Sequence, residues 1–273
     1  MDTLLRNSRR KLSQGLLFWS EAGQGIPVIL LHGAWNDSSQ WSSVIEKLAQ
    51  DFHCFAPDLL GFGESDKPKI HHSIDLQVES IAELLQALRL ERVYFVGHSV
   101  GGWIAASYAL KYPEQVEGLV LLAPEGVKIE QQEKRWQQMR KLVETPPLFV
   151  KILKFLKPLT KMLGWQEKIE QDLAQRHIWL QYPTACQLLF QRQKPEIEAE
   201  LLQDKLHLIE APVLILQGGK DSSDALFRSQ TYQQLIPQAE FKLVAHAEND
   251  LPSNCAGIVA EEVRDFINAV KLI

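Results

Sequence analysis

The 273-residue sequence is poor in cysteine and has no long apolar run or block of like charge. Its three cysteines, Cys54, Cys186 and Cys255, are too far apart for a disulfide framework or metal-ligand spacing. No run approaches the roughly 18 apolar residues of a membrane span. The 29 basic and 34 acidic residues are interspersed, so we expect no nucleic acid partner.

The N-terminal residues also lack the features of a secretory leader. Residues 1–11 place their charges after a short apolar pair and contain no apolar h-region. Together with the cysteine content, this predicts a cytoplasmic, reduced protein.

Short apolar runs alternate with helical patterns along most of the chain. This rhythm predicts an α/β fold, with a mostly parallel central sheet covered by helices on both faces. The first segment, residues 11–19, is typical of an antiparallel edge strand followed by a turn at 21–25. The expected buried strands are 27–31, 52–56, 93–96, 118–122, 213–216 and 241–245.

The alternation stops between Pro124 and about Glu210, where helical patterns follow one another. We therefore expect a core formed by 1–124 and 211–273, with a helical cap inserted at 125–210. Within the cap, residues 148–165 place lysines on one helical face. This lysine face could contact a membrane surface. The simpler alternative is that it faces solvent while the other side of the helix covers the cap's apolar interior.

A strand, a sharp turn and a helix are indicated around Ser99. The sequence Gly97-His98-Ser99-Val100-Gly101-Gly102 follows the β-branched run 93–96 and precedes the helical stretch 103–110. In this setting a G-x-S-x-G sequence is typical of a nucleophile elbow, because small neighbours let the chain bend and expose the serine Oγ.

A second glycine turn, His32-Gly33-Ala34-Trp35, follows the strand predicted at 27–31. Strand ends of a parallel sheet share one edge, so the amides of Ala34 and Val100 can together form an oxyanion hole. We expect His32 and His98, each beside a glycine turn, to make local hydrogen bonds rather than to act as a catalytic base.

These motifs resemble those of the α/β-hydrolase family, in its branch with helical caps. The matching stretches are His32-Gly33, 57–68, 97–102 and 212–221. The resemblance implies that Ser99 is the nucleophile and that Asp221 orients a histidine. Asp221 can also be a simple turn aspartate, and Glu125, after another strand, is a second candidate acid.

The sequence departs from the family pattern at the expected histidine. The loop after the last strand reads His246-Ala247-Glu248-Asn249-Asp250, and an ungapped register places Asn249 at the histidine position. An asparagine amide cannot take a proton from a serine. Either His246 swings over the elbow from a shifted loop, or the site is catalytically weakened or adapted to ligand binding.

The first alternative predicts a serine hydrolase with the triad Ser99, Asp221 and His246. It would act on an ester, a related acyl bond or a carbon–carbon bond of a small apolar molecule through an acyl-enzyme, and it needs no metal or organic cofactor. The second predicts a binding module for a small ligand or a protein. Either way, Trp35 and Trp103 are candidate pocket walls, as are Trp136 and Phe149 in the cap; all four can equally be core residues.

Overall fold

The computed structural model describes residues 5–130, 132–146 and 166–272. These residues form two compact units, the first comprising 1–129 with 200–273 and the second 130–199. We call them the core unit and the cap unit and describe each by itself.

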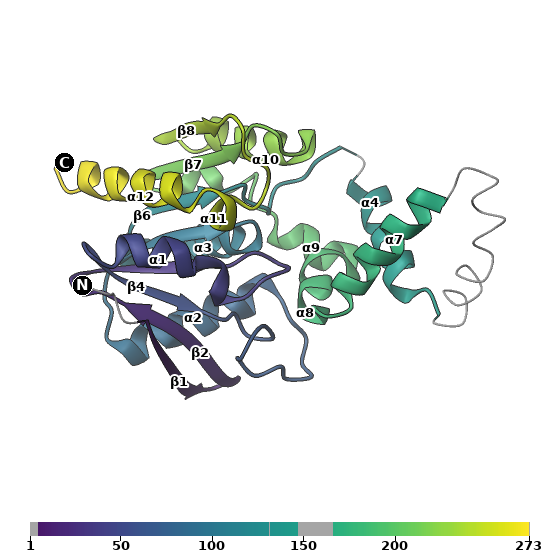
Figure 1. The fold of residues 1–273 in the computed structure, drawn as a ribbon, viewed down its shortest axis with the longest axis horizontal. Coiled ribbons are helices and arrows are strands. Elements are labelled where there is room, and N and C mark those ends of the chain that lie inside the picture. The colour runs from purple at the N-terminus through teal and green to yellow at the C-terminus, as the bar shows by residue number, and fades with distance from the viewer. Residues whose placement is uncertain (1–4, 131, 147–165, 273) are drawn as a thin grey trace. The chain divides into compact units, whose positions relative to one another are not determined.

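An eight-stranded, mostly parallel sheet forms the centre of the core unit, in the order β1-β2-β4-β3-β5-β6-β7-β8 (Figure 1). The first two pairings, β1 with β2 and β2 with β4, are antiparallel, and the remaining pairings are parallel. The strands are β1 (Arg6–Leu12), β2 (Gly15–Ala22), β3 (Ile26–Leu31), β4 (Phe52–Pro57), β5 (Val93–His98), β6 (Val116–Leu122), β7 (Val213–Gly218) and β8 (Ala239–Val244). This arrangement confirms the predicted fold class.

Helices cover both faces of the sheet (Figure 1). On one face, Val28 and Leu30 of β3 pack with the apolar stripes of α1 and α12. On the other, the ring of Phe95 in β5 lies 4.8 Å from that of Tyr108 in α3. The core-unit helices are η1 (Ser38–Trp41), α1 (Ser42–Leu48), α2 (Ile74–Leu88), α3 (Val100–Lys111), η2 (Pro113–Gln115), η4 (Leu206–Leu208), α10 (Ser223–Leu235), α11 (Leu251–Asn254) and α12 (Ala256–Val270).

Two of the strand predictions require correction. The segment predicted as one strand over 11–19 contains the turn of a hairpin, because β1 ends at Leu12 and β2 begins at Gly15. The strand predicted over 241–245 is not buried: β8 is the last strand of the sheet, and its residues are half-buried or exposed. An apolar run identifies a strand but does not tell whether a neighbour will cover it.

Within its described residues, all the regular secondary structure of the cap unit is helical. Its elements are α4 (Gln132–Glu144), α7 (Gln166–Trp179), α8 (Pro183–Cys186), a π-turn η3 (Gln187–Gln191) and α9 (Lys194–Glu200). The sequence placed the insertion at 125–210, but the structure assigns 125–129 and 200–210 to the core unit. Hydrogen bonds explain the difference: Leu202 N donates to the Gly126 carbonyl (2.8 Å) and Trp103 Nε1 to the Glu200 carbonyl (3.0 Å).

Candidate functional site

Ser99 lies at a sharp turn between β5 and α3, as the sequence predicted. Its φ of 52° and ψ of −114° lie outside the usual regions for a residue with a side chain, which costs on the order of 1–3 kcal/mol. Backbone hydrogen bonds hold this geometry: Ser99 N donates to the Leu122 carbonyl (2.9 Å), and its own carbonyl accepts from Trp103 N and Glu125 N (both 3.1 Å). The half-buried Oγ makes no hydrogen bond within the described residues.

Two glycines permit the close packing around this turn. A Cβ on Gly101 would lie 2.2 Å from the Leu31 carbonyl oxygen. The backbone of α3 therefore packs directly against the backbone at the end of β3, with no room for a side chain between them. A Cβ on Gly33 would lie 2.7 Å from His98 Nδ1 and 3.5 Å from Ser99 Cβ. The loop that follows β3 is therefore directly beside the serine.

Two backbone amides are expected to form an oxyanion hole. One belongs to Val100, the residue after Ser99, and the other to Ala34, in the loop that follows β3. Ala34 and Val100 are both buried. Neither N–H donates a hydrogen bond to any residue in the described part of the chain. Both amides are therefore without a partner in that part of the chain, as the first amides of a helix and of a tight turn commonly are.

The carboxylate of Asp221 follows β7 and accepts three hydrogen bonds. Oδ1 accepts from Ser222 N (2.6 Å), and Oδ2 accepts from Gln217 Nε2 (3.1 Å) and from Asn249 Nδ2 (2.9 Å). Gln217 is fully buried, and its Oε1 accepts from Ser229 Oγ (2.6 Å). These contacts fix the carboxylate at the sheet edge that carries Ser99.

Asn249, and not His246, is the residue that contacts Asp221 in this structure. The chain just after β7 is tied to the end of β8 and to the loop that follows it. Gly219 N donates to the Val244 carbonyl and Lys220 N to the Ala247 carbonyl (both 2.9 Å). His246 is exposed in the turn that begins this loop, and no described residue hydrogen-bonds to it. The expectation that His246 swings over the elbow does not describe this arrangement, because the two ties fix the loop in the ungapped register.

Glu125, the second candidate acid, is committed to another contact. Its Oε1 lies 2.9 Å from Nη2 of the buried Arg228. Its backbone carbonyl also accepts from Tyr232 OH (2.6 Å). Glu125 therefore supports the loop after β6 through α10.

His32 makes the local hydrogen bond that the sequence analysis expected, whereas the partners of His98 are distant in the chain. His32 Nδ1 donates to the Gly33 carbonyl (2.8 Å), and Nε2 accepts from Leu59 N (3.0 Å). His98 Nε2 donates to the Asn249 carbonyl (3.0 Å). Burial lowers the pKa of both histidines, an effect that nearby carboxylates oppose (Asp58 for His32, Asp250 for His98).

Three further residues matter at this edge, and the sequence analysis did not identify them: Gln40, Gln217 and Asp250. Gln40 and Gln217 are buried. A glutamine inside the apolar strand of β7 is a signal that could have been noticed, because a buried amide needs hydrogen-bond partners.

The aromatic residues proposed as pocket walls have different surroundings. Trp103 is a core residue, 2% exposed, packed so closely that a Cβ on Gly126 would lie 2.4 Å from its ring. Trp35 and Trp136 are half-buried, and Phe149 lies outside the described residues. Residues 148–165, proposed to meet a membrane, also lie outside them. No helix within the described ranges is long and apolar enough to cross a membrane.

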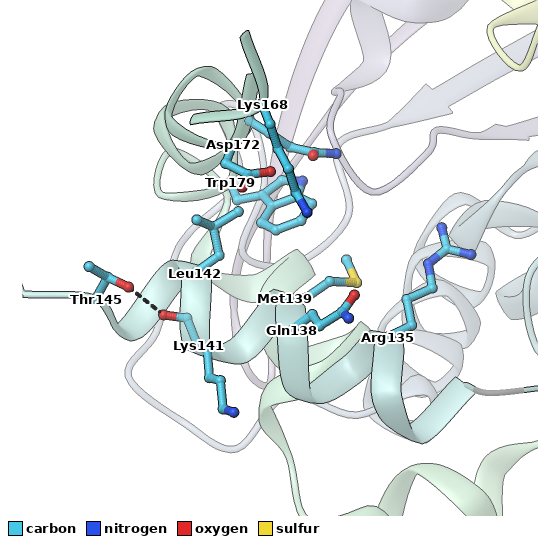
Figure 2. Close-up of a pocket in the computed structure, with 10 residues that line it drawn as sticks. Arg135, Gln138, Met139, Lys141, Leu142, Thr145, Lys168, Asp172 and Trp179 are labelled. Carbon is cyan, nitrogen blue, oxygen red and sulfur yellow. Dashed lines mark hydrogen bonds between the residues drawn. The ribbon is translucent and has the colours of Figure 1, made fainter. Parts of the chain in front are cut away.

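A hollow of about 520 Å³ opens within the cap unit, between α4 and α7 (Figure 2). Met139, Leu142 and Trp179 give it an apolar wall, and the tryptophan ring lies 5.7 Å from that of Phe190. Charged side chains surround it, namely Arg135, Lys141, Lys168 and Asp172. Among the residues that the structure describes, no cluster of three or more His, Cys, Asp and Glu side chains could hold a metal ion.

Comparison with known proteins identifies chains that resemble this one in part of their length. A rat protein called 1-acylglycerol-3-phosphate O-acyltransferase ABHD5 is 40% identical over 115 residues, which is 41% of this chain and 33% of that protein. A 2-hydroxy-6-oxo-2,4-heptadienoate hydrolase of Pseudomonas putida is 37% identical over 117 residues, 40% of this chain and 41% of that enzyme. The matched stretches thus span well under half of either relative.

Among solved structures, an esterase of Thermogutta terrifontis with malate bound superimposes with a TM-score of 0.75 at 23% identity, covering 96% of this chain and 99% of that one. At this identity the likeness shows the fold. The model of the α/β-hydrolase fold family matches residues 26–251. The chain belongs to the α/β-hydrolase fold family.

Proposed function

We propose that the protein binds a small molecule through an acyl or carboxylate group at Ser99, and that Asn249 keeps acyl transfer to Ser99 slow. The observation that carries this proposal is the hydrogen bond from Asn249 Nδ2 to Asp221 Oδ2 (2.9 Å). In a serine triad the residue bonded to the acid is a histidine, whose second ring nitrogen takes the serine proton. Asn249 keeps the bond to the acid but supplies no basic nitrogen.

The donors around Ser99 suit an acyl or carboxylate oxygen. The amides of Ala34 and Val100 and the hydroxyl of Ser99 all lack a partner in the described part of the chain. Such a group of donors stabilises a carbonyl oxygen or a carboxylate whether or not a reaction follows. The relatives support this ligand class, because their names refer to an acylglycerol phosphate and an oxo acid, and the esterase of similar fold holds malate.

A second candidate function is serine hydrolysis with His246 as the base. It is favoured by the backbone of Ser99, which is strained at the turn between β5 and α3, and by an exposed His246 that no described residue engages. A rearranged loop would let His246 take the Ser99 proton during attack on an ester. The Ala34 and Val100 amides would hold the oxyanion, Asp221 would stabilise the imidazolium, and water would release the acyl-enzyme.

A fluorophosphonate probe distinguishes the two functions, because its addition to Ser99 needs an activated serine and no knowledge of the substrate. The rate of labelling is measured by intact mass for the wild type, His246→Ala, Asn249→His and Asn249→Gln, with Ser99→Ala as the blank. We expect slow wild-type labelling that His246→Ala does not change. Asn249→His should raise the rate by about 10²- to 10⁴-fold, the usual contribution of a general base, whereas Asn249→Gln should not.

Fast wild-type labelling that collapses in His246→Ala would overturn the binding proposal and establish the hydrolase. Ligand binding is measured separately by calorimetry with butyrate, octanoate and their ethyl esters. We expect at least one of them to bind both the wild type and Ser99→Ala, with no ester cleavage that depends on His246. Failure of all four to bind would contradict the proposed ligand class.

A further inference from the structure

The side chain of Gln40 joins the three loops that meet at Ser99. Gln40 lies in η1 and is 5% exposed. Its Oε1 accepts from Gly33 N (3.0 Å), in the loop that carries the Ala34 amide. Its Nε2 is 3.1 Å from His98 Nδ1, beside the serine, and donates to Asp250 Oδ1 (2.9 Å), beside Asn249.

The hydrogen-bond partners determine the orientation of this amide. Gly33 N can only donate and the Asp250 carboxylate can only accept, so the oxygen of Gln40 must face Gly33 and its nitrogen must face Asp250. The second N–H of Gln40 then points to His98 Nδ1, which must accept it. The reverse orientation would place two donors together at Gly33 and two acceptors together at Asp250.

The same reasoning determines the protonation of His98. Its Nε2 must carry a proton, because its partner is the backbone carbonyl of Asn249 (3.0 Å). Its Nδ1 must be bare, because Gln40 donates to it. His98 is therefore a neutral imidazole in the Nε2–H tautomer, and a second proton on this ring would face the N–H of Gln40.

We propose that Gln40, acting through neutral His98, is a positioning residue for the Ser99 site: it holds the Gly33–Ala34 amides and the Asn249–Asp250 loop in register with the elbow. The four hydrogen bonds connect segments that are 7, 58, 151 and 210 residues apart in the chain. This inference goes beyond the proposed function, since either a bound carboxylate or an acyl-transfer oxyanion needs the same amides in place.

Gln40→Glu is the sharpest variant, because it keeps the shape of the side chain and replaces its donor by an acceptor. The new carboxylate would still accept from Gly33 N but would face Asp250 and a bare Nδ1. His98 should then take up a proton and donate it to residue 40. The carboxylates that act on the ring from the neighbouring loops, Asp250 and Asp221, both favour the charged form as well.

The primary measurement is the nitrogen-15 NMR spectrum of the imidazole rings between pH 5 and 9. In the wild type we expect His98 to show the Nε2–H tautomer throughout, without titration. In Gln40→Glu we expect a cationic His98 at neutral pH. Gln77→Glu is the matched control, since Gln77 is also fully buried but donates to the Leu60 carbonyl away from this cluster; it should leave the His98 signals unchanged.

A wild-type His98 that titrates near its ordinary pKa, or that populates both tautomers, would overturn the proposal. So would Gln40→Glu spectra identical to those of the wild type. These outcomes test the hydrogen-bond assignment even if every ligand experiment at Ser99 fails.

The second test measures the rate at which the fluorophosphonate labels Ser99. It is made in the Asn249→His variant, in which we expect that rate to be measurable. Adding Gln40→Ala should lower the fluorophosphonate rate by about 10²-fold, comparable to losing an oxyanion donor. Adding Gln77→Ala should change it much less. An unchanged rate in the Gln40→Ala double variant would contradict the positioning role, whereas an unreactive Asn249→His parent would count only against the proposed function.

Discussion

The core unit and the cap unit are held together in different ways. In the core unit, strands β3, β5, β6 and β7 are almost entirely buried, and their side chains pack between helices on both faces of the sheet. In the cap unit, no described side chain of α4 is buried, and Trp179 is the buried residue of α7. Apolar burial therefore stabilises these strands far more than it stabilises α4 and α7; in the cap unit most buried apolar side chains lie in α8, η3 and α9.

Arginine side chains connect the cap elements instead. Arg140 of α4 donates to the carbonyls of Phe190 (2.7 Å from Nη2) and Arg192 (2.9 Å). Arg176 of α7 donates to the carbonyls of Leu142 (3.0 Å) and Thr145 (2.8 Å) at the end of α4. Backbone acceptors at helix ends need partners, and these arginines satisfy them where few apolar contacts exist. The difference matters for the candidate site, because Ser99, Asp221 and Asn249 all belong to the core unit with its buried strands.

The largest expected effect tests the close packing of the core unit. Gly101→Val should prevent the core from folding, because its Cβ would lie 2.2 Å from the Leu31 carbonyl oxygen and only backbone movement could relieve the contact. Circular dichroism and amide hydrogen exchange measure the loss. Gly257→Ala in α12 is the matched control: nothing lies within 4 Å of the added Cβ, so stability should rise by about 0.5–1 kcal/mol. A folded Gly101→Val protein would contradict the account of the elbow.

The next effect concerns pH and the buried histidines of the core unit. Burial lowers the pKa of His32 and His98 below the ordinary 6.5, so the unfolded chain binds protons more readily than the folded one. The stability they contribute is complete above about pH 6.5 and is lost as the pH falls toward their folded pKa values. The slope can reach about 1.4 kcal/mol per pH unit for each proton taken up.

Urea titrations at pH 7.5, 6.5 and 5.5 would measure this loss. His32→Asn or His98→Asn should reduce the slope if the variant folds. Equal stability at the three pH values would indicate that these histidines are not buried in neutral form.

A smaller effect tests the hydrogen bonds of the cap unit. Arg140→Ala should destabilise the cap by about 1.5–3 kcal/mol, as expected for hydrogen bonds from a charged donor. Hydrogen exchange resolved by peptide should show faster exchange in α4 and in residues 187–192, with the core strands unchanged. Lys134→Ala, from an exposed position on the same helix, is the control. Equal exchange in the two variants would show that the arginine does not hold these elements together.

The smallest effect concerns an ion pair on the surface of the cap. Lys194 Nζ lies 2.5 Å from Glu133 Oε1, and both side chains are about half exposed. The charge of Glu133 raises the pKa of Lys194 through this hydrogen bond. Solvent screens exposed pairs of this kind, so Lys194→Ala should shift the unfolding midpoint only slightly. A loss as large as that of Arg140→Ala would mean that charge pairing stabilises the cap.

Several elements were predictable because their signals are local. The buried strands at 93–96 and 213–216 and the turn at Ser99 follow from the order of apolar, small and β-branched residues. The hairpin turn at 13–14 and the exposure of β8 were not predictable in this way. The turn and the exposure both depend on which strands pair with each other. The order of side chains within one strand does not identify its partner strand.

At the site, the sequence by itself determined that Ser99 follows a strand and precedes a helix and that Asp221 follows a later strand, and it left open whether His246 or Asn249 would reach Asp221. Only the tertiary structure decided that Asn249, rather than His246, bonds to Asp221, and that Gln40 joins Gly33, His98 and Asp250. The physical reason is distance along the chain. Backbone conformation follows from neighbouring residues, whereas hydrogen-bond partners as far as 210 residues apart meet only when the sheet brings the loops together.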